Sequence, residues 1–417
     1  MMYGARQVGK TYILKEFGKH EFPNFVYINC FNNPTVASFF SQDTDVRRIL
    51  RDLSVYADQE IRPHETLLIL DEIQDIPLAV ASLKYFNEDA PEYFVASAGS
   101  LLGVMNMEGT SFPTGNVDIL DMYPMTFHEF LNAVGQERKA SLLNDADALG
   151  SINSLSSSYI EILRHYYYVG GMPEAVKEFI DSGDSEKIRK IQHDIITAYY
   201  SDIAKHAGKD AAKARMVLQS IPGQLARENK KFIFGAVKPG ARASEFENAI
   251  QWLIDARMVY KINRVTKAAI PLKFYFENQS FKLYLLDVGL LGAMVEAPAS
   301  QVLIGSNIFS EYKGAFTENF VLEQMVTLRN IVIGYFTKDN STVEIDFIVQ
   351  FKDRIVPIEV KAEENVKSKS FRQFVTVDNA DKDMKGLRLS MKGFVDQGWM
   401  VNAPLFAAIN NPLLHKP

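Results

Sequence analysis

The sequence has a single cysteine, Cys30, among 417 residues. One thiol cannot form an internal disulfide, which fits a reducing interior, and it excludes a zinc site built from cysteines. The seven histidines show no spacing typical of a metal site. No stretch reaches the roughly 18 apolar residues of a membrane span, and the first residues lack the apolar core of a signal peptide. These absences predict a soluble, cytoplasmic protein that does not cross a membrane.

Neither sign of charge dominates the chain. The formal net charge is −6 and the isoelectric point is near 5.8. These values argue against a nucleic-acid-binding surface over the whole chain, while a local basic face stays compatible with them. Hydrophobic residues make up 47% and charged residues 23%, as in ordinary globular proteins. A chain of this length should divide into two to four domains.

A phosphate-binding pattern stands at the beginning of the sequence, where GARQVGKT fits G-x-x-x-x-G-K-[ST]. Gly4 and Gly9 tolerate positive φ and close approach, so backbone N–H groups can turn toward phosphate oxygens. Lys10 would then reach the β and γ phosphates, and the Thr11 hydroxyl would hold Mg²⁺. The pattern predicts ATP and Mg²⁺ as ligands.

The stretch TLLILDEIQDIP supplies the second half of such a site. Residues 66–70 form a continuous apolar run, which is typical of a parallel strand buried on both faces. Asp71 at its end would complete the Mg²⁺ shell, and Glu72 would polarise the attacking water. Farther on, EYFVASAGSLLG predicts another strand at 93–96. Ser97 or Ser100 after it would sense the γ phosphate, or Ser-Ala-Gly-Ser is simply a turn.

Strands alternate with helical segments through this region. FVYINC at 25–30 is a further predicted strand, and alternation of this kind predicts a parallel, doubly wound sheet. Ligands of such sheets bind at the carboxyl ends of the strands. Both proposed acids lie at such an end.

The motifs resemble those of a known family. GARQVGKT, LLILDEIQDIP, AGSLLG, LDMYPMTFHEFL and YYYVGGMPEAV are similar, in this order, to landmarks of bacterial and archaeal AAA-type ATPases that carry a C-terminal domain of unknown function. The resemblance covers nearly the whole chain. It implies an α/β fold with a P-loop NTPase parallel sheet, a helical and winged-helix middle, and a C-terminal restriction-endonuclease-like α/β domain.

Two features depart from the family pattern. Family members have a basic residue after a glycine before the YP motif, a trans-acting charge, whereas PTGNV has Asn116 there. We therefore assign no arginine finger. Family members also have a helix and an apolar strand before the phosphate loop, whereas three residues precede it here. We expect that the chain as recorded starts late and that the sheet lacks a central strand.

Residues after the ATPase part predict a mainly helical connector followed by a winged helix. Three short helices and then MVYKINRV and LKFYFENQSFKLYLLD as paired strands make up the winged-helix pattern. We predict four parts, which are an ATPase domain at 1–140, a helical connector at 141–204, a winged-helix-like domain at 205–290 and a restriction-endonuclease-like domain at 291–417.

The segment between Lys205 and Arg242 is strongly basic. It has nine lysines or arginines against Asp210 and Glu228, a balance of 9 − 2 = +7. Such a face on a winged helix predicts contact with the DNA backbone. The alternative is a solvated basic surface on a protein-docking module.

A second possible active site lies near the C-terminus, where Glu318 falls in a predicted helix and Asp346, Glu359 and Lys361 in predicted strands. An acid followed by Glu-x-Lys resembles metal-dependent nucleases of the restriction-endonuclease-like fold. Asp346 and Glu359 would hold Mg²⁺, and Lys361 would stabilise the developing charge. The alternative is an ion pair in a fold that no longer cuts DNA.

The sequence thus supports an ATP-hydrolysing protein with a nuclease-like module that acts on DNA. Its alternative is a nucleotide-binding interaction or signalling protein whose nuclease-like domain is catalytically inactive. Oligomerisation is compatible with either function.

Overall fold

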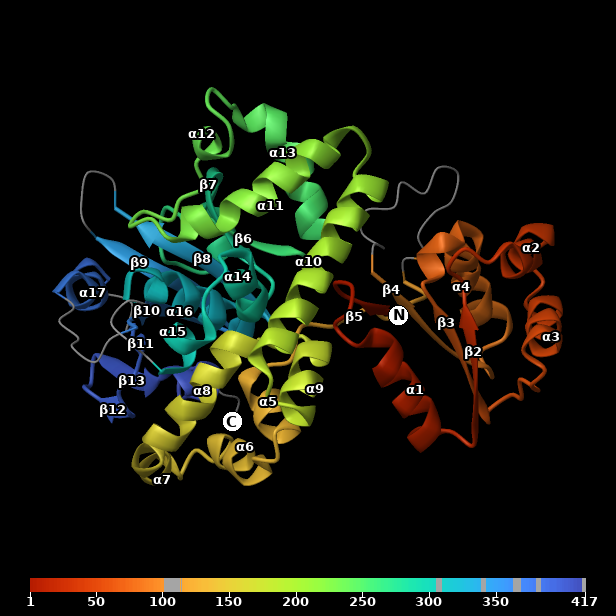
Figure 1. The fold of residues 1–417 in the computed structure, drawn as a ribbon, viewed down its shortest axis with the longest axis horizontal. Helices are drawn as coiled ribbons and strands as arrows, with labels where there is room; N and C mark the ends of the chain where they lie inside the picture. Colours follow the sequence, from red (N-terminus) through yellow and green to blue (C-terminus); the bar gives the residue numbers. More distant parts are fainter. Residues whose placement is uncertain are drawn as a thin grey trace. The chain divides into compact units, whose positions relative to one another are not determined.

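The computed structural model describes residues 1–100, 113, 115–304, 310–338, 343–362, 369–379 and 384–414. The chain divides into two compact units. Unit 1 comprises Met1–Tyr123 and Asp255–Met258, and unit 2 comprises Pro124–Ile254 and Val259–Pro417. Figure 1 shows their elements. The last three residues of AGSLLG lie outside the described residues.

Unit 1 contains a five-stranded parallel sheet in the order β2-β3-β4-β1-β5. The strands are β1 (Met2–Tyr3), β2 (Asn24–Asn29), β3 (Thr66–Asp71), β4 (Phe94–Gly99) and β5 (Leu120–Asp121). The helices are α1 (Lys10–Glu21), α2 (Pro34–Gln42), α3 (Val46–Ala57) and α4 (Pro77–Asp89). The predicted α/β fold with a P-loop parallel sheet is confirmed.

The strand β3 lies between two hydrophobic cores, and all six of its residues are buried. Leu67 and Ile69 pack with Leu14 of α1. Leu68 and Leu70 face the other way, into a core formed with α2, α3 and α4. Because side chains alternate along a strand, a continuous apolar run buries both faces of the sheet. The run in TLLILD therefore determined the doubly wound arrangement.

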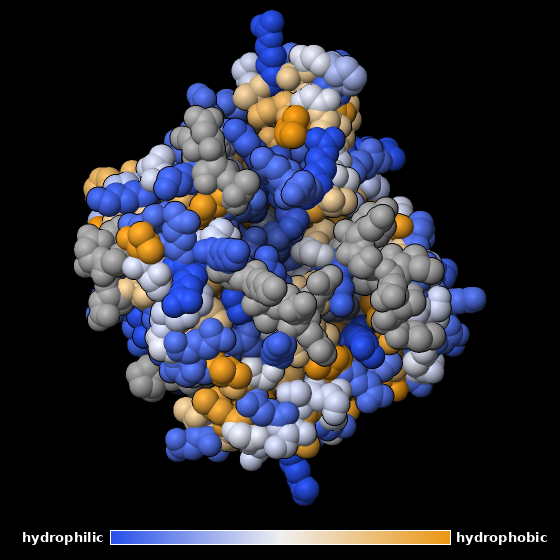
Figure 2. All heavy atoms as spheres, turned by 90° about the vertical axis from the view of Figure 1, so that its left-hand side faces the viewer, coloured by the Kyte–Doolittle hydropathy of each residue, from blue (hydrophilic) through white to orange (hydrophobic). Residues whose placement is uncertain are grey.

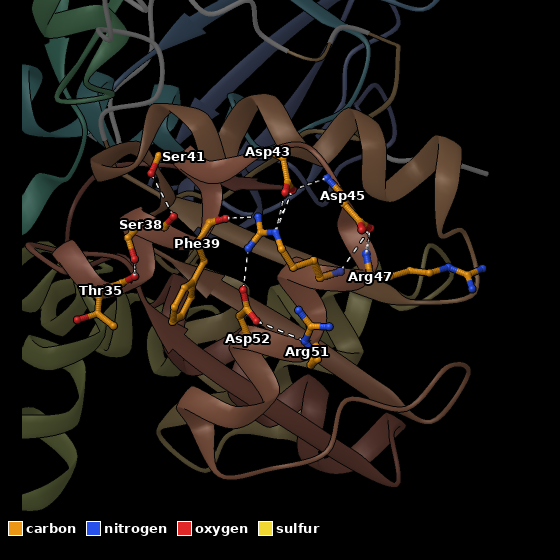
Figure 3. Close-up of polar contacts among 10 residues, drawn as sticks. Thr35, Ser38, Phe39, Ser41, Asp43, Asp45, Arg47, Arg51 and Asp52 are labelled. Carbon is orange, nitrogen blue, oxygen red and sulfur yellow. Dashed lines mark hydrogen bonds and ion pairs between the residues drawn. The ribbon is translucent and has the colours of Figure 1, made fainter.

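One arginine holds the turn between α2 and α3. The guanidinium of Arg48 donates to Asp43 at 2.9 Å, to Asp52 at 2.7 Å and to the carbonyl oxygen of Phe39 at 2.6 Å (Figure 3). Asp45 caps α3 by accepting from the backbone N–H of Arg47 at 3.0 Å. These charge-assisted bonds stabilise the helices that cover the sheet face opposite α1.

The residues before the phosphate loop form the short strand β1. Met2 pairs with Ala98 of β4 and with Leu120 of β5, and Tyr3 continues both ladders. The gap that we expected at the centre of the sheet is thus filled at this end by two residues. A cavity of about 240 Å³ lies next to this strand, and Met1 and Val95 of β4 are among the residues in its wall.

Unit 2 begins with helices and continues into a large sheet. Its helices are α5 (Phe127–Ala133), α6 (Glu137–Leu143), α7 (Leu149–Ser154), α8 (Ser156–Val169), α9 (Pro173–Asp181), α10 (Ser185–His206), α11 (Ala211–Leu225), α12 (Phe234–Val237), α13 (Ala243–Asp255), α14 (Val288–Met294), α15 (Ala299–Ile304), α16 (Ser310–Met325) and α17 (Lys369–Gln373). Gly170 ends α8 with φ 76° and Pro173 starts α9. The glycine and the proline therefore separate these two helices.

The sheet of unit 2 has eight strands in the order β12-β13-β11-β10-β9-β8-β6-β7. The strands are β6 (Val259–Val265), β7 (Phe276–Leu285), β8 (Ile331–Thr337), β9 (Glu344–Phe351), β10 (Arg354–Val360), β11 (Gly386–Ser390), β12 (Val395–Asp396) and β13 (Met400–Pro404). The hairpin β6–β7 follows α11, α12 and α13 as expected for a winged helix. It also pairs with β8, so the hairpin and the C-terminal strands share one sheet. The winged-helix assignment and the four domain boundaries stay predictions.

Figure 2 shows the face that lies at the left of Figure 1, where α17 and β12 are found. Hydrophilic residues dominate it, and hydrophobic residues are scattered singly or in small groups. Scattered exposed apolar residues are normal for a solvated protein surface. None of the described helices is both long enough and apolar enough to span a membrane.

The motifs YPMTFHEFL and YYYVGGMPEAV meet in a buried hydrogen-bond network. The N–H of Met125 donates to the carbonyl of Gly171 at 2.7 Å, and the N–H of Gly171 donates to Asp287 at 2.6 Å. The Tyr166 hydroxyl donates to the carbonyl of Met125 at 2.5 Å. A Cβ on Gly170 would lie 2.3 Å from a carboxylate oxygen of Asp287. These landmarks therefore build the interior of unit 2.

Candidate functional site

The phosphate loop connects β1 to α1, and two of its residues have positive φ. Gly9 has φ 95° directly before the helix, and Gln7 has φ 67°. Gly4 meets the other expected requirement, which is close approach of its backbone. A Cβ there would lie 2.3 Å from the carbonyl oxygen of Met122. Positive φ thus explains the second glycine of the motif, and close packing against the backbone explains the first.

The side chain of Lys10 lies inside this loop, and the residue is only 6% exposed. Its ammonium group donates to the carbonyl oxygens of Gly4 at 3.0 Å and Ala5 at 2.7 Å. Burial lowers the pKa of Lys10 to about 8, partly offset by the carboxylates of Glu72 and Asp71. The loop therefore contains a cation that is charged below about pH 8.

The carboxylate of Asp71 joins the loop to the end of β3. The Thr11 hydroxyl donates to its Oδ2 at 2.7 Å, and the N–H of Glu72 donates to its Oδ1 at 3.1 Å. Tyr27 of β2 also donates to Oδ2, at 2.9 Å. Burial and Asp71 raise the pKa of Tyr27, so its hydroxyl stays protonated. Sequence reasoning missed Tyr27, because no motif marks a neighbouring strand.

Glu72 follows β3 directly and has φ 48°. Its Oε2 accepts from Nε2 of Gln74 at 2.5 Å and from the hydroxyl of Ser100 at 3.4 Å. Ser100 is thus the serine that reaches the proposed site, whereas Ser97 lies in the wall of the cavity beside β4. The structure places Lys10, Thr11, Asp71, Glu72 and Ser100 at the same carboxyl edge of the sheet.

Asn116, where the family has a basic residue, accepts a hydrogen bond from the side-chain amide of Asn87 at 2.9 Å. It lines the same cavity as Ser97. A neutral amide in that place supplies no charge to a phosphate. The assignment of no arginine finger stays a prediction.

A cluster of buried charges lies in unit 2, and sequence reasoning identified it only in part. Glu318 of α16 forms an ion pair with Lys230 and accepts from the Tyr284 hydroxyl at 3.0 Å. Lys282 of β7, which is 1% exposed, pairs with Glu344 of β9 at 2.8 Å. Buried carboxylates need such partners. Lysines on distant segments supply them, and no spacing in the sequence indicates this.

Asp346 of β9 lies beside this cluster. Its Oδ2 accepts from the backbone N–H of Val360 at 2.7 Å. Burial and the charge of Glu318 raise the pKa of Asp346 to about 7, while Lys282 opposes the shift. Without a cation beside it, a carboxyl group in this environment holds its proton more readily than an exposed aspartate does.

Two basic side chains contact the carboxylate of Glu359 on β10. The Nε of Arg388 on β11 donates to it at 3.0 Å, and both side chains are buried. The ammonium of Lys361 lies 3.6 Å from the other carboxylate oxygen. The predicted Glu-x-Lys pair is therefore in contact, but an arginine that sequence reasoning missed joins it.

In the described part of the chain, no three or more histidine, cysteine or acidic residues are grouped so that they could hold a metal. Mg²⁺ can also be held by one or two carboxylates and water, so the partners of these acids decide whether they are available. Cationic groups already contact Glu318 and Glu359. The roles of Asp346, Glu359 and Lys361 in cleavage stay predictions that this arrangement does not support.

The predicted basic face is only partly available. Lys230 is in the ion pair with Glu318, and Lys213 lies 3.5 Å from Asp210. The exposed basic residues are Lys205, Lys209, Arg215, Arg227, Lys231, Lys238 and Arg242. The helix α13, which would be the recognition helix of a winged helix, exposes Glu245 and Glu247. Those charges oppose its entry into a DNA groove.

Family models match separate parts of the chain. Residues 1–131 match an AAA domain, residues 160–301 match a domain of unknown function (DUF8612), and residues 313–402 match another domain of unknown function (DUF4143). The first match contains the phosphate loop and Asp71, so the part of the chain that is similar to an AAA domain includes the candidate site of unit 1. The other two matches assign no activity to unit 2.

Solved structures are only distantly similar to the chain. The Orc1 protein of Aeropyrum pernix, in complex with DNA, is 14% identical with a TM-score of 0.26, and the match covers 72% of this chain and 87% of that one. Protein VC1899 of Vibrio cholerae is 9% identical with a TM-score of 0.14, covering 94% and 88%. None of the curated proteins compared with the chain matches it.

Proposed function

We propose that unit 1 binds ATP and hydrolyses it. The proposal rests on the hydrogen bond of 2.7 Å from the Thr11 hydroxyl to Asp71, which joins two motifs separated by 60 residues. P-loop NTPases use such a hydroxyl and such a carboxylate to hold Mg²⁺ beside the phosphates. Lys10 in the same loop adds the positive charge that a triphosphate requires.

Each proposed residue has one task in this reaction. Thr11 and Asp71 fit a magnesium ion that is completed by phosphate oxygens and water, and the ion would neutralise phosphate charge. Lys10 binds the β and γ phosphates, and the N-terminal end of α1 faces them. Glu72 accepts the proton of the attacking water. The water oxygen bonds to the γ phosphorus, the bond to the bridging oxygen breaks, and ADP leaves with that electron pair.

The full chain should hydrolyse ATP only with Mg²⁺ present, and Asp71→Asn should lower kcat/KM by about 100-fold because a neutral amide replaces the carboxylate at Thr11. Release of phosphate at saturating and limiting ATP measures both constants. Asp75→Asn is the matched control, since Asp75 is exposed and lies outside this group. Equal rates for the wild type and Asp71→Asn would refute the proposal.

We also propose that exposed basic residues of unit 2 contact the DNA backbone without cutting it. Lys231, Lys238 and Arg242 are exposed, and neutralised phosphates give an affinity that falls with salt. The absence of cutting is supported by the buried ion pairs of Glu318 and Glu359. This favours an inactive nuclease-like domain over an active one.

Plasmid mixed with the full chain and Mg²⁺ should be retained on a filter at low salt and should stay supercoiled. Replacing Lys231, Lys238 and Arg242 together by Glu should abolish retention or lower the slope of log affinity against log salt by about 3. Lys84→Glu, on α4 of unit 1, should leave retention unchanged. Nicking of the plasmid by the wild type that is absent with the Asp346→Ala variant would establish cleavage. Retention of DNA that does not change with salt concentration would exclude contact with the DNA backbone.

A further inference from the structure

The turn after β3 brings a glutamine back onto the proposed catalytic acid. The 3-10 turn Ile73–Asp75 follows Glu72 at once, and the left-handed φ of Glu72 reverses the chain there. As a result Nε2 of Gln74 donates to Oε2 of Glu72 at 2.5 Å. This conformation is energetically unfavourable for a non-glycine residue. The contact is therefore built by a locally unfavourable backbone.

The side-chain oxygen of the same amide accepts no hydrogen bond from the described residues. Gln74 is 8% exposed, and its Oε1 is buried without a hydrogen-bond partner among the described residues. A buried polar atom without a partner destabilises the folded state. The orientation of the amide is nevertheless unambiguous, because only its N–H can face a carboxylate. A residue selected for stability alone would be apolar here or would have both ends paired.

Three groups together fix the position of Glu72. Its backbone N–H donates to Asp71 at 3.1 Å, and its Oε2 accepts from both Gln74 and the Ser100 hydroxyl. A carboxylate held at one oxygen by two donors has little freedom to rotate. Its Oε1 then has a defined direction.

We propose that Gln74 is a positioning residue for ATP hydrolysis, which holds Oε2 of Glu72 so that Oε1 receives the proton of the attacking water. Gln74 itself touches neither ATP nor water. The inference rests on the proposed hydrolysis by unit 1. It gives a physical role to Gln74 of the stretch LLILDEIQDIP, a residue to which the sequence assigned no task.

The variant Gln74→Met keeps the length of the side chain, removes the donor and also removes the unpaired oxygen. We expect kcat for ATP to fall by about 10- to 100-fold, because a displaced base loses reactive geometry, while KM changes less than twofold. The melting temperature should stay equal or rise. If Gln74 had only a structural role, Gln74→Met would instead lower the melting temperature and leave kcat per folded molecule unchanged.

A double variant tests whether Gln74 acts through Glu72. Once Glu72→Gln has removed the base, adding Gln74→Met should not lower the residual rate further. If the wild type hydrolyses ATP but Gln74→Met has its full kcat, or if the two losses multiply, the positioning role is overturned while the hydrolysis stands. If the wild type shows no Mg²⁺-dependent turnover, the hydrolysis itself fails, and the positioning role fails with it. Gln74→Glu, which lacks the donor at the carboxylate, should reproduce the loss of kcat if Gln74→Met does not fold.

Discussion

Lys10→Ala should lower kcat/KM for ATP by about 10²- to 10³-fold, equivalent to roughly 3–4 kcal/mol of binding and transition-state stabilisation. In the structure Lys10 is 6% exposed and its ammonium is bonded only to loop carbonyl oxygens among the contacts described. Phosphate oxygens would replace these neutral partners. Titration with a fluorescent ATP analogue and measurement of phosphate release separate the loss of binding from the loss of turnover.

The pH dependence of binding supplies an independent test of Lys10. Its pKa is lowered to about 8 in the free protein, so the ammonium is largely charged below that pH and loses its proton above it. Bound phosphates favour the charged form. ATP binding at pH near 9 should therefore take up close to one proton, and affinity should fall as pH rises through 8.

Calorimetry in two buffers with different ionisation enthalpies measures this proton uptake. Lys10→Arg is the matched control, since arginine stays charged at every accessible pH. The arginine variant should bind without proton uptake from Lys10. Equal uptake in both proteins would show that another group titrates, and an unaltered ATPase rate in Lys10→Ala would remove the phosphate loop from the mechanism.

Gly171→Ala should destabilise unit 2 by roughly 3 kcal/mol or more. The added Cβ would lie 2.2 Å from the carbonyl oxygen of Met125 and 2.8 Å from its nitrogen, and these are backbone atoms that cannot rotate away. Separation of the two segments would also weaken the bond of 2.6 Å from the Gly171 N–H to Asp287, a buried carboxylate. One methyl group therefore disturbs both motifs of the network.

Urea unfolding followed by tryptophan fluorescence measures this change, because both tryptophans, Trp252 and Trp399, lie in unit 2. Gly150→Ala is the matched control. No heavy atom lies within 4 Å of a Cβ built there, and alanine within a helix such as α7 should stabilise by up to about 1 kcal/mol. A midpoint for Gly171→Ala that equals the wild-type value would show that the network tolerates the methyl group.

Local patterns predicted unit 1 well. The motif GARQVGKT and the apolar run before Asp71 are each contiguous, and a parallel sheet brings the ends of its strands to one edge. The positions of Lys10, Thr11, Asp71 and Glu72 followed from that rule alone. The choice between Ser97 and Ser100 did not, because it depends on where β4 ends relative to Glu72.

Contacts between distant segments were not predictable in the same way. Arg388 is 29 residues from Glu359 in the sequence, and Lys230 is 88 residues from Glu318. No sequence motif surrounds Arg388 or Lys230 to mark these partners. The Glu-x-Lys pattern left two alternatives open, a metal site and an ion pair. Only the packed sheet of unit 2 shows which cations approach these acids.

The sequence by itself determined the phosphate loop, the order of strands and helices in unit 1 and the glycines that separate α8 from α9, because each depends on neighbouring residues and on backbone preferences. The tertiary structure alone decided that β6–β7 joins the C-terminal sheet, that Tyr27 contacts Asp71, and that Lys230 and Arg388 contact Glu318 and Glu359. The reason is physical. Hydrogen bonds and ion pairs between remote segments depend on burial and on distances of about 3 Å, which a one-dimensional pattern does not specify.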